Sequence, residues 1–195
     1  MNRILILFAH PLFEKSKIHQ SLIKSIPNSD FITFHDLYEV YPEFNIRIKK
    51  EQELLVGHDI IIWQHPFYWY SVPPLMKQWM DLALEFGWAY GPGGEALKGK
   101  IIFNILSTGG REEAYSPEGR NRYTIHQFLA PVEQTVRLCH MHYLPPFVIH
   151  GTHLLSPAEI NKYSHQYNSL LEHLQNSSID SIKSFKGKYL NEIVI

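Results

Sequence analysis

Continuous apolar runs recur along the chain up to residue 106 and predict its strands. Residues 3–9 (RILILFA), 59–64 (DIIIWQ) and 100–106 (KIIFNIL) contain little polar alternation, and a shorter run covers 31–34 (FITF). The three longer runs are typical of strands buried on both faces of a parallel sheet, and the shorter run predicts a further strand. A fifth strand is expected within 143–149 (YLPPFVI), starting after its prolines, because proline cannot donate to a strand ladder.

Amphipathic segments lie between these runs and predict helices. Pro27 and Gly57 mark the ends of the first two, and Pro74 suits the first turn of the third. We expect the fourth helix to be continuous although it contains Pro131. The predicted helices cover residues 18–26, 46–56, 74–84, 124–139 and 157–174.

Strands that alternate with helices predict an α/β fold, namely a doubly wound five-stranded parallel sheet with helices on both faces. We expect one domain over residues 1–174. The remaining residues, 175–195, form a tail that is polar at first and ends in YLNEIVI. This tail is expected to be either a disordered linker with a short strand or a segment that docks on a partner.

Composition narrows the class of protein. The net charge is −1 and there is no long basic run, which speaks against nucleic acid as a partner. No apolar run approaches the roughly 20 residues of a membrane helix, and no signal-peptide pattern is present, so a cytoplasmic protein is expected. Cys139 is the single cysteine and is interpreted as a buried structural residue. The twelve histidines lack a recognised zinc spacing, so no metal site is predicted.

Three loops follow predicted strands one, three and four, at the edge where a doubly wound sheet binds its ligand. The first, 10–19 (HPLFEKSKIH), places Ser16 to cap a helix or to meet an anion. The second, 66–74 (PFYWYSVPP), is either a lid on the core or a stacking platform for a flat ligand. The third, 107–110 (STGG), either turns the chain or lets a ligand approach the backbone. No GxGxxG motif is present, and together the loops indicate a phosphorylated planar cofactor such as FMN.

Several longer motifs strengthen this interpretation. The chain contains FAHP with a later Ser, WQHPFYWYSVPPLMKQWMD, FGWAYGPGG and LSTGG, then EEAYSPEGRNRYTIHQFLAPVE and MHYLPPF. Over roughly residues 3–172 it resembles the flavodoxin-like NAD(P)H:quinone oxidoreductases. Within them it is most similar to the ancillary subunits of the glutathione-regulated Kef potassium efflux systems.

The resemblance implies the residues of an FMN site. The family usually has Asn where this chain has His19. Phosphate and ribityl contacts are implied for His10, Ser16, Lys17, Ile18 and His19. Contacts with the isoalloxazine ring, largely through the backbone, are implied for Phe67, Tyr68, Trp69 and Tyr70. The other edge of the ring would be lined by Ser107, Thr108, Gly109 and Gly110.

The same resemblance implies a homodimer with the flavin near the interface, NADPH or NADH as co-substrate, and a quinone as acceptor. Backbone amides of Gly109 and Gly110 are candidates to stabilise negative charge on the reduced ring. Tyr115 and Tyr123 are candidate proton donors, or merely pack the loop. Arg111, Arg120 and Arg122 either meet a nicotinamide dinucleotide phosphate or remain solvated.

Other classes of function stay open. The chain could be a regulatory flavin-binding subunit that docks on a Kef-type potassium/proton antiporter at the inner face of the cell membrane. It could also be an electron-carrying flavodoxin, although such carriers tend to be strongly acidic and a net charge of −1 speaks against it. A histidine-based metal protein is a further alternative.

Overall fold

A parallel sheet forms the centre of the molecule in the computed structural model, which describes residues 1–193. The strand order is β2-β1-β3-β4-β5, and β6 also pairs with β4. Every pairing is parallel, and β1 places Ile6 between Phe34 of β2 and Ile62 of β3. The strands are β1 (Ile4–Phe8), β2 (Ile32–Asp36), β3 (Ile60–Pro66), β4 (Ile101–Ser107), β5 (His142–Tyr143) and β6 (Phe147–Ile149).

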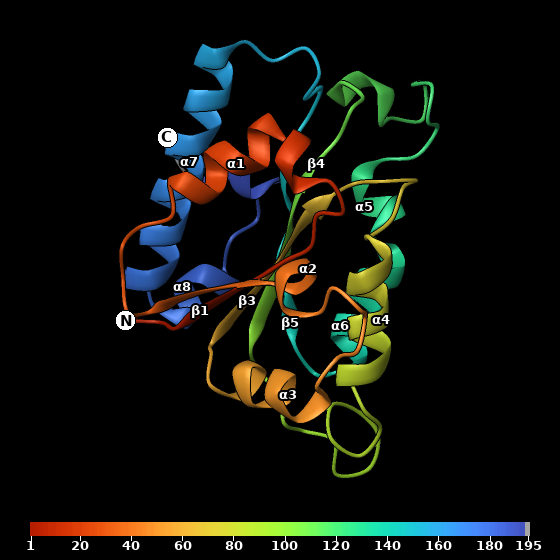
Figure 1. The fold of residues 1–195 in the computed structure, drawn as a ribbon, viewed down its shortest axis with the longest axis vertical. Coiled ribbons are helices and arrows are strands. Elements are labelled where there is room, and N and C mark those ends of the chain that lie inside the picture. Colours follow the sequence, from red (N-terminus) through yellow and green to blue (C-terminus); the bar gives the residue numbers. More distant parts are fainter. Residues whose placement is uncertain (194–195) are drawn as a thin grey trace.

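Helices cover both faces of the sheet (Figure 1). One face carries α1 (Lys17–Lys24), α7 (Pro157–Asn176) and α8 (Ile179–Lys183). The other carries α2 (Leu37–Val40), α3 (Ile48–Val56), α4 (Pro74–Ala83), α5 (Ile125–Phe128) and α6 (Ala130–Leu138). Residues 1–193 also form the 3₁₀ turns η1 (Phe13–Lys15), η2 (Glu112–Ala114) and η3 (Leu190–Glu192). The predicted doubly wound fold is confirmed.

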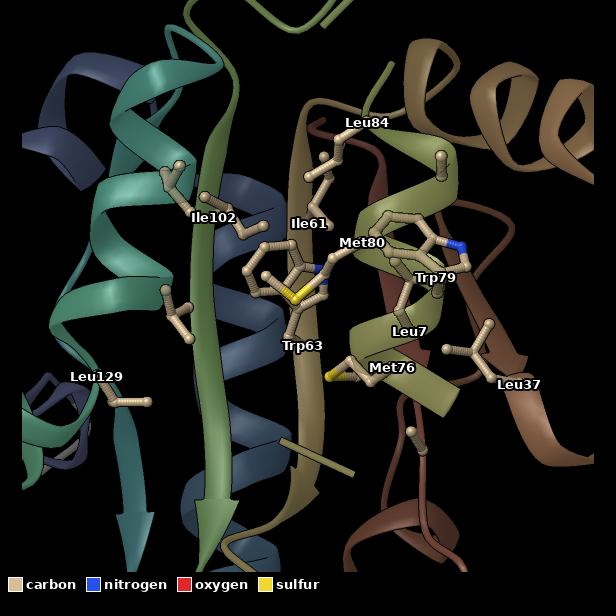
Figure 2. Close-up of a cluster of buried hydrophobic side chains, with 14 of the residues drawn as sticks. Leu7, Leu37, Ile61, Trp63, Met76, Trp79, Met80, Leu84, Ile102 and Leu129 are labelled. Carbon is tan, nitrogen blue, oxygen red and sulfur yellow. The ribbon is translucent and has the colours of Figure 1, made fainter. Parts of the chain in front are cut away.

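The sheet separates two buried apolar clusters, because successive side chains of a strand point to opposite faces. Ile4 and Ile6 of β1 pack with Tyr167 of α7 on one side. Leu5 and Leu7 pack on the other side with Trp79 of α4. Figure 2 shows this second cluster, in which Trp63 of β3 and Trp79 meet edge to face with ring centroids 6.3 Å apart. The three longer apolar runs therefore form the central strands β1, β3 and β4, buried on both faces, whereas the shorter run forms the partly exposed edge strand β2.

Two predicted elements are divided in the structure. The prediction of one continuous helix over 124–139 is wrong, because α5 ends at Phe128 and α6 begins at Ala130. Pro131 lies in the first turn of α6, where the missing N–H costs no hydrogen bond. The fifth strand is also divided: β6 begins after the prolines as predicted, whereas β5 precedes them and was missed.

The tail after residue 174 folds against the body of the protein. Ile182, Tyr189 and Leu190 are buried, and Leu190–Glu192 form a 3₁₀ turn where the sequence suggested a short strand within YLNEIVI. The last two residues of that motif lie outside the described residues. The Asn191 side chain pairs with the backbone of the edge strand β6, because it donates to the Val148 carbonyl at 3.0 Å and accepts from the Val148 amide at 2.8 Å. The tail thereby satisfies a strand edge that would otherwise be unpaired.

Replacement of Asn191 by alanine should destabilise the fold by about 1–3 kcal/mol, because it leaves the buried Val148 amide and carbonyl without partners. Urea unfolding measures the loss. Asn161→Ala, on the exposed side of α7, is the matched control and should stay within about 0.5 kcal/mol of the wild type. Equal stability of the two variants would show that the tail is dispensable for the sheet edge.

Candidate functional site

A cavity of about 440 Å³ opens at the carboxyl ends of β1, β3 and β4, where the strand order reverses direction. In Figure 1 this edge of the sheet lies toward the top, next to the start of α1. The cavity is lined by His10, Leu12, Lys15, Ser16, Lys17, Ile18, Pro66, Phe67, Tyr68, Ser107, Gly109, Thr152, His153, Leu155 and Ile160. Residues from all three loops identified in the sequence therefore meet at one site.

The first loop brings the N-terminus of α1 to the cavity. Ser16 is the N-cap of α1, and its hydroxyl accepts from the His19 amide at 3.3 Å. The amides of Lys17 and Ile18 belong to the first turn, which has no carbonyl acceptor within the helix. Because both residues line the cavity, this end presents free N–H groups, a positive helix end and an exposed lysine. It is suited to an anion.

The second loop divides the predicted aromatic residues into two groups. Phe67 and Tyr68 line the cavity, and the Phe67 amide donates to the Ser107 carbonyl at 2.8 Å, which ties this loop to the third. Trp69 and Tyr70 have positive φ angles of 49° and 63° in a tight turn and do not line the cavity. Trp69 is 93% exposed, and Tyr70 stacks on Phe128 at 4.8 Å.

The third loop carries backbone donors. Gly109 lines the cavity, and a Cβ atom added there would lie 3.3 Å from the His153 ring. Thr108 is buried, and its hydroxyl donates to the Gly110 carbonyl at 2.7 Å, which fixes the turn. Within residues 1–193 no acceptor is hydrogen-bonded to the amide of Gly109 or of Gly110. Both N–H groups therefore lack an acceptor in this part of the chain, and of the two residues Gly109 is the one that lines the cavity.

The remaining predicted residues surround the site without lining it. Tyr115 is buried between Phe67 and His150, and its ring lies 3.2 Å from where a Cβ of Gly110 would be. Burial raises the pKa of Tyr115, so its hydroxyl stays protonated at neutral pH. Tyr123 is 55% exposed and packs edge to face on Phe128. The three arginines of this loop, Arg111, Arg120 and Arg122, are all exposed.

A fourth loop completes the cavity and was missed. It follows β6 and supplies Thr152 and His153, and Leu155 and Ile160 come just after it. The Thr152 amide donates to the Thr108 carbonyl at 3.0 Å, so this loop is held against the third. A topological signal was available, because the fifth strand of a parallel sheet also ends at this edge. His19 is not at the surface of the cavity but directly behind Ser107, with its Nε2 at 2.9 Å from Ser107 Oγ.

Three histidines near the floor of the cavity are held neutral by burial. Desolvation lowers the pKa of His10 and of His65 to about 4, and it lowers that of His19 well below the ordinary value. His10 Nδ1 accepts from the Leu12 amide at 3.1 Å, so the proton of its neutral form lies on Nε2. His10 can therefore donate one hydrogen bond to a ligand in the cavity.

Acid should destabilise the protein through these histidines. Between pH 6.5 and about 4 the unfolded chain protonates His65 whereas the folded chain does not, so stability falls as pH falls through this window. The expected contribution of His65 is about 1 kcal/mol per pH unit. Urea unfolding at pH 6 and pH 5 measures this slope, and His65→Gln should reduce it by about one proton. An unchanged slope in that variant would contradict the burial argument.

Two other properties bear on the class of site. Within residues 1–193, no group of three or more histidine, cysteine, aspartate or glutamate side chains is arranged to hold a metal ion. None of the helices in this same part of the chain has both the length and the apolar character needed to cross a membrane. Cys139 is buried, and desolvation raises its pKa to about 11, so it is a structural thiol as predicted.

The strand order β2-β1-β3-β4-β5 defines a doubly wound α/β protein of the flavodoxin type. A cavity large enough for a ligand lies where this order reverses, as expected for that type. The sequence profile of a family described as having a flavodoxin-like fold matches residues 2–174. The chain belongs to this flavodoxin-like family, as the sequence motifs predicted. The tail after residue 174 lies outside the match.

Individual relatives agree with this assignment. The glutathione-regulated potassium-efflux system ancillary protein KefG of Pectobacterium carotovorum is 40% identical over 169 residues, which cover 87% of this chain and 92% of the relative. General stress protein 14 of Treponema denticola, solved in complex with FMN, has a TM-score of 0.83 and 37% identity, covering 89% of this chain and 99% of the other. An NADPH-quinone reductase of P. pentosaceus has a TM-score of 0.80 and 30% identity, covering 90% and 99%.

Proposed function

We propose that this protein is an FMN-dependent oxidoreductase that transfers hydride from NADPH or NADH to a quinone. One observation carries the proposal: a single cavity joins the start of α1, which is suited to an anion, to an aromatic wall and to the backbone amide of Gly109, unpaired within residues 1–193. The relatives support it, because one is solved with FMN and another is an NADPH-quinone reductase.

The residues of the cavity fit the chemical parts of FMN. The first turn of α1 with Ser16 and Lys17 suits a phosphate, which has the charge and acceptors that such a helix end binds. Phe67 and Tyr68 offer an apolar wall for a flat ring. A volume of about 440 Å³ is in the usual range of pockets for ligands of this size.

Each group of residues has a proposed role. The flavin would supply the capacity to accept a hydride from a reduced nicotinamide and return it to a quinone. Ser16 and the amides of Lys17 and Ile18 hold the phosphate end, whereas the His19 amide already donates to the Ser16 hydroxyl. The amides of Gly109 and Gly110 stabilise negative charge at the ring edge, since no acceptor within residues 1–193 is bonded to them.

The other predicted contacts have secondary roles in this proposal. Trp69 and Tyr70 shape the loop and its outer surface through the turn they form. Tyr115 is the better placed of the two candidate proton donors, because it lies against Gly110 whereas Tyr123 is exposed beside Phe128. Arg111, Arg120 and Arg122 lie on the surface of the same loop and are candidates to meet the phosphates of the nicotinamide dinucleotide.

The test is to supply the purified protein with FMN, record the flavin absorption bands, and follow their bleaching after rapid mixing with NADPH or NADH. The proposal expects bound flavin, reduction on a catalytic timescale, and reoxidation by a quinone. Absence of bound flavin would refute the cofactor assignment. Bound flavin that is not reduced by either nicotinamide would refute the enzymatic assignment alone.

A second function is favoured by the likeness to KefG, a potassium-efflux system ancillary protein. The protein would then be a regulatory flavin-binding subunit that docks on a Kef-type antiporter at the inner face of the cell membrane. Both functions can belong to one protein. Potassium efflux measured with and without this chain, in cells that contain the antiporter, tests the regulatory role, and equal efflux would exclude it.

We also propose a homodimer in which Trp69 is a contact. This large side chain is 93% exposed beside the cavity, and a fully solvated tryptophan next to the half-exposed Tyr68 and Tyr70 indicates a binding surface. Sedimentation velocity should give about twice the chain mass of 22.8 kDa for the wild type and a shift toward the monomer for Trp69→Ala. Phe31→Ala, at the opposite edge of the sheet, is the control. A monomeric wild type would refute the dimer.

A further inference from the structure

A chain of buried polar side chains runs from α7 to the floor of the cavity. The Tyr167 hydroxyl lies 2.8 Å from Gln64 Oε1, and Gln64 Nε2 lies 3.4 Å from His19 Nδ1. His19 Nε2 then lies 2.9 Å from Ser107 Oγ. Tyr167, Gln64 and His19 have no exposed surface, whereas Ser107 lines the cavity. Water cannot satisfy the first three residues, so their donors and acceptors must match one another.

The donors and acceptors of these side chains determine the direction of each hydrogen bond in the series. Tyr167 has no other hydrogen-bond partner within residues 1–193, so its hydroxyl donates to the Gln64 carbonyl oxygen. The amide nitrogen of Gln64 then faces His19 Nδ1 and can only donate, which makes Nδ1 an acceptor. The proton of the neutral imidazole must therefore lie on Nε2, which donates to Ser107 Oγ. Ser107 accepts that bond, and its own O–H is left to point elsewhere.

We propose that His19 is a positioning residue that fixes the Ser107 hydroxyl as a hydrogen-bond donor toward the ligand in the cavity. The site would thus select a ligand that places an acceptor atom, such as a carbonyl, hydroxyl or phosphate oxygen, beside Ser107. A ligand with a donor at that position would leave two hydrogens facing each other. The inference deepens the proposed function, since the ligand with which it is tested is FMN.

The electrostatics of the site agree with a neutral His19. Burial, then the neighbouring His10 and His65, lower the pKa of His19 well below its ordinary value. An imidazolium would place an Nδ1–H against the donating amide of Gln64. In the neutral Nε2–H form, Nδ1 of His19 accepts from the Gln64 amide and Nε2 donates to the Ser107 hydroxyl, so each group has a partner. His19 therefore acts through Ser107 and does not need to reach the ligand.

One alternative arrangement would exchange the donor and the acceptor in each of these hydrogen bonds. If the Gln64 side chain were rotated by 180°, its oxygen would accept from an Nδ1–H of His19, and Ser107 would donate to Nε2 and present only lone pairs to the cavity. Tyr167 would then have to accept from the amide, and its own hydrogen would be buried without a partner. The two arrangements predict opposite tautomers of His19, which is a measurable difference.

Nitrogen-15 NMR of the side chains in the FMN-free protein at pH 7 reads the tautomer directly, with His19→Asn used to assign the signal. The inference expects a protonated Nε2 and an unprotonated Nδ1. A protonated Nδ1, alone or in the imidazolium, would overturn it. Tyr167→Phe removes the hydroxyl that orients Gln64 and should shift the tautomer populations. If the hydroxyl only supports packing, its removal would change the stability of the protein without shifting the tautomer populations of His19.

Titration with FMN measures the effect on the ligand. Ser107→Ala should weaken FMN binding by about 5- to 10-fold, as expected for one lost neutral hydrogen bond. Ser107→Thr, which keeps a hydroxyl, should bind FMN more tightly than Ser107→Ala. Equal FMN affinity in the wild type and Ser107→Ala would overturn the donor role. If the wild type shows the predicted tautomer but binds no FMN, the proposed cofactor fails while the orientation of His19 stands.

Discussion

Replacement of Ser16 by aspartate is expected to weaken FMN binding by about 100-fold or more, because it places a carboxylate about where the phosphate should bind. Ser16 caps α1 and lines the cavity, so the new charge would lie beside the free amides of Lys17 and Ile18. The stability of the fold should not decrease. Aspartate is as good an N-cap as serine, and a negative charge is favourable at the start of a helix. Fluorescence titration of the bound flavin measures the affinity, and urea unfolding checks the stability.

Two controls separate charge at this helix from a general effect. Riboflavin lacks the phosphate, so its affinity should be the same in the wild type and Ser16→Asp. Ser178→Asp makes the same substitution at another N-cap, that of α8, where the serine hydroxyl likewise accepts from an amide, that of Ser181. That variant should bind FMN as the wild type does. Wild-type FMN affinity in Ser16→Asp would remove the start of α1 from the site.

The sequence was sufficient to predict the N-cap at Ser16 because local rules decide it. A buried strand, a polar loop and a serine before a helix are enough to place an N-cap at the carboxyl edge of a parallel sheet. The same rules cannot tell which rings of PFYWYSVPP face the cavity. Trp69 and Tyr70 turn away because both adopt a left-handed backbone conformation, which nothing in their side chains requires.

Long-range packing determines the other features of the site and fold that could not be predicted from the sequence. His19 is held behind Ser107 by Gln64 of β3, which lies 45 positions away in the chain. Gln64 is in turn bonded to Tyr167 of α7, a further 103 positions along. The loop with Thr152 and His153 lies at the cavity because β6 pairs with β4 beyond two prolines. The division between α5 and α6 at Leu129 is subtler, since Pro131 permits both a kinked helix and a new start.

Replacement of Trp79 by alanine is expected to lower the free energy of unfolding by about 3–5 kcal/mol, a large part of the stability of an ordinary domain. The indole has no exposed surface and packs against Trp63 across the space between α4 and β3 (Figure 2). Its Nε1–H also donates to Glu51 at 2.8 Å. The substitution therefore opens a cavity in the core and removes a donor from a buried carboxylate.

The donor matters because Glu51 is 1% exposed and depends on its partners. Burial raises the pKa of Glu51, but hydrogen bonds from His35, Tyr41 and Trp79 outweigh burial and lower it overall. This contribution to stability is present above the ordinary carboxyl pKa and is lost as pH falls through the lowered value. Part of the effect of Trp79→Ala should therefore disappear in acid, whereas the loss due to the cavity should remain.

Trp79→Phe separates these two causes. It keeps most of the buried volume and removes the N–H, so at pH 7 it should cost about 1–3 kcal/mol, less than alanine. Leu138→Ala, at the half-exposed end of α6, is the surface control and should stay within about 0.5 kcal/mol of the wild type. Urea unfolding of the three variants gives the comparison. Equal losses for phenylalanine and alanine would show that the bond to Glu51, and not the packing of the ring, accounts for the role of Trp79 in the core.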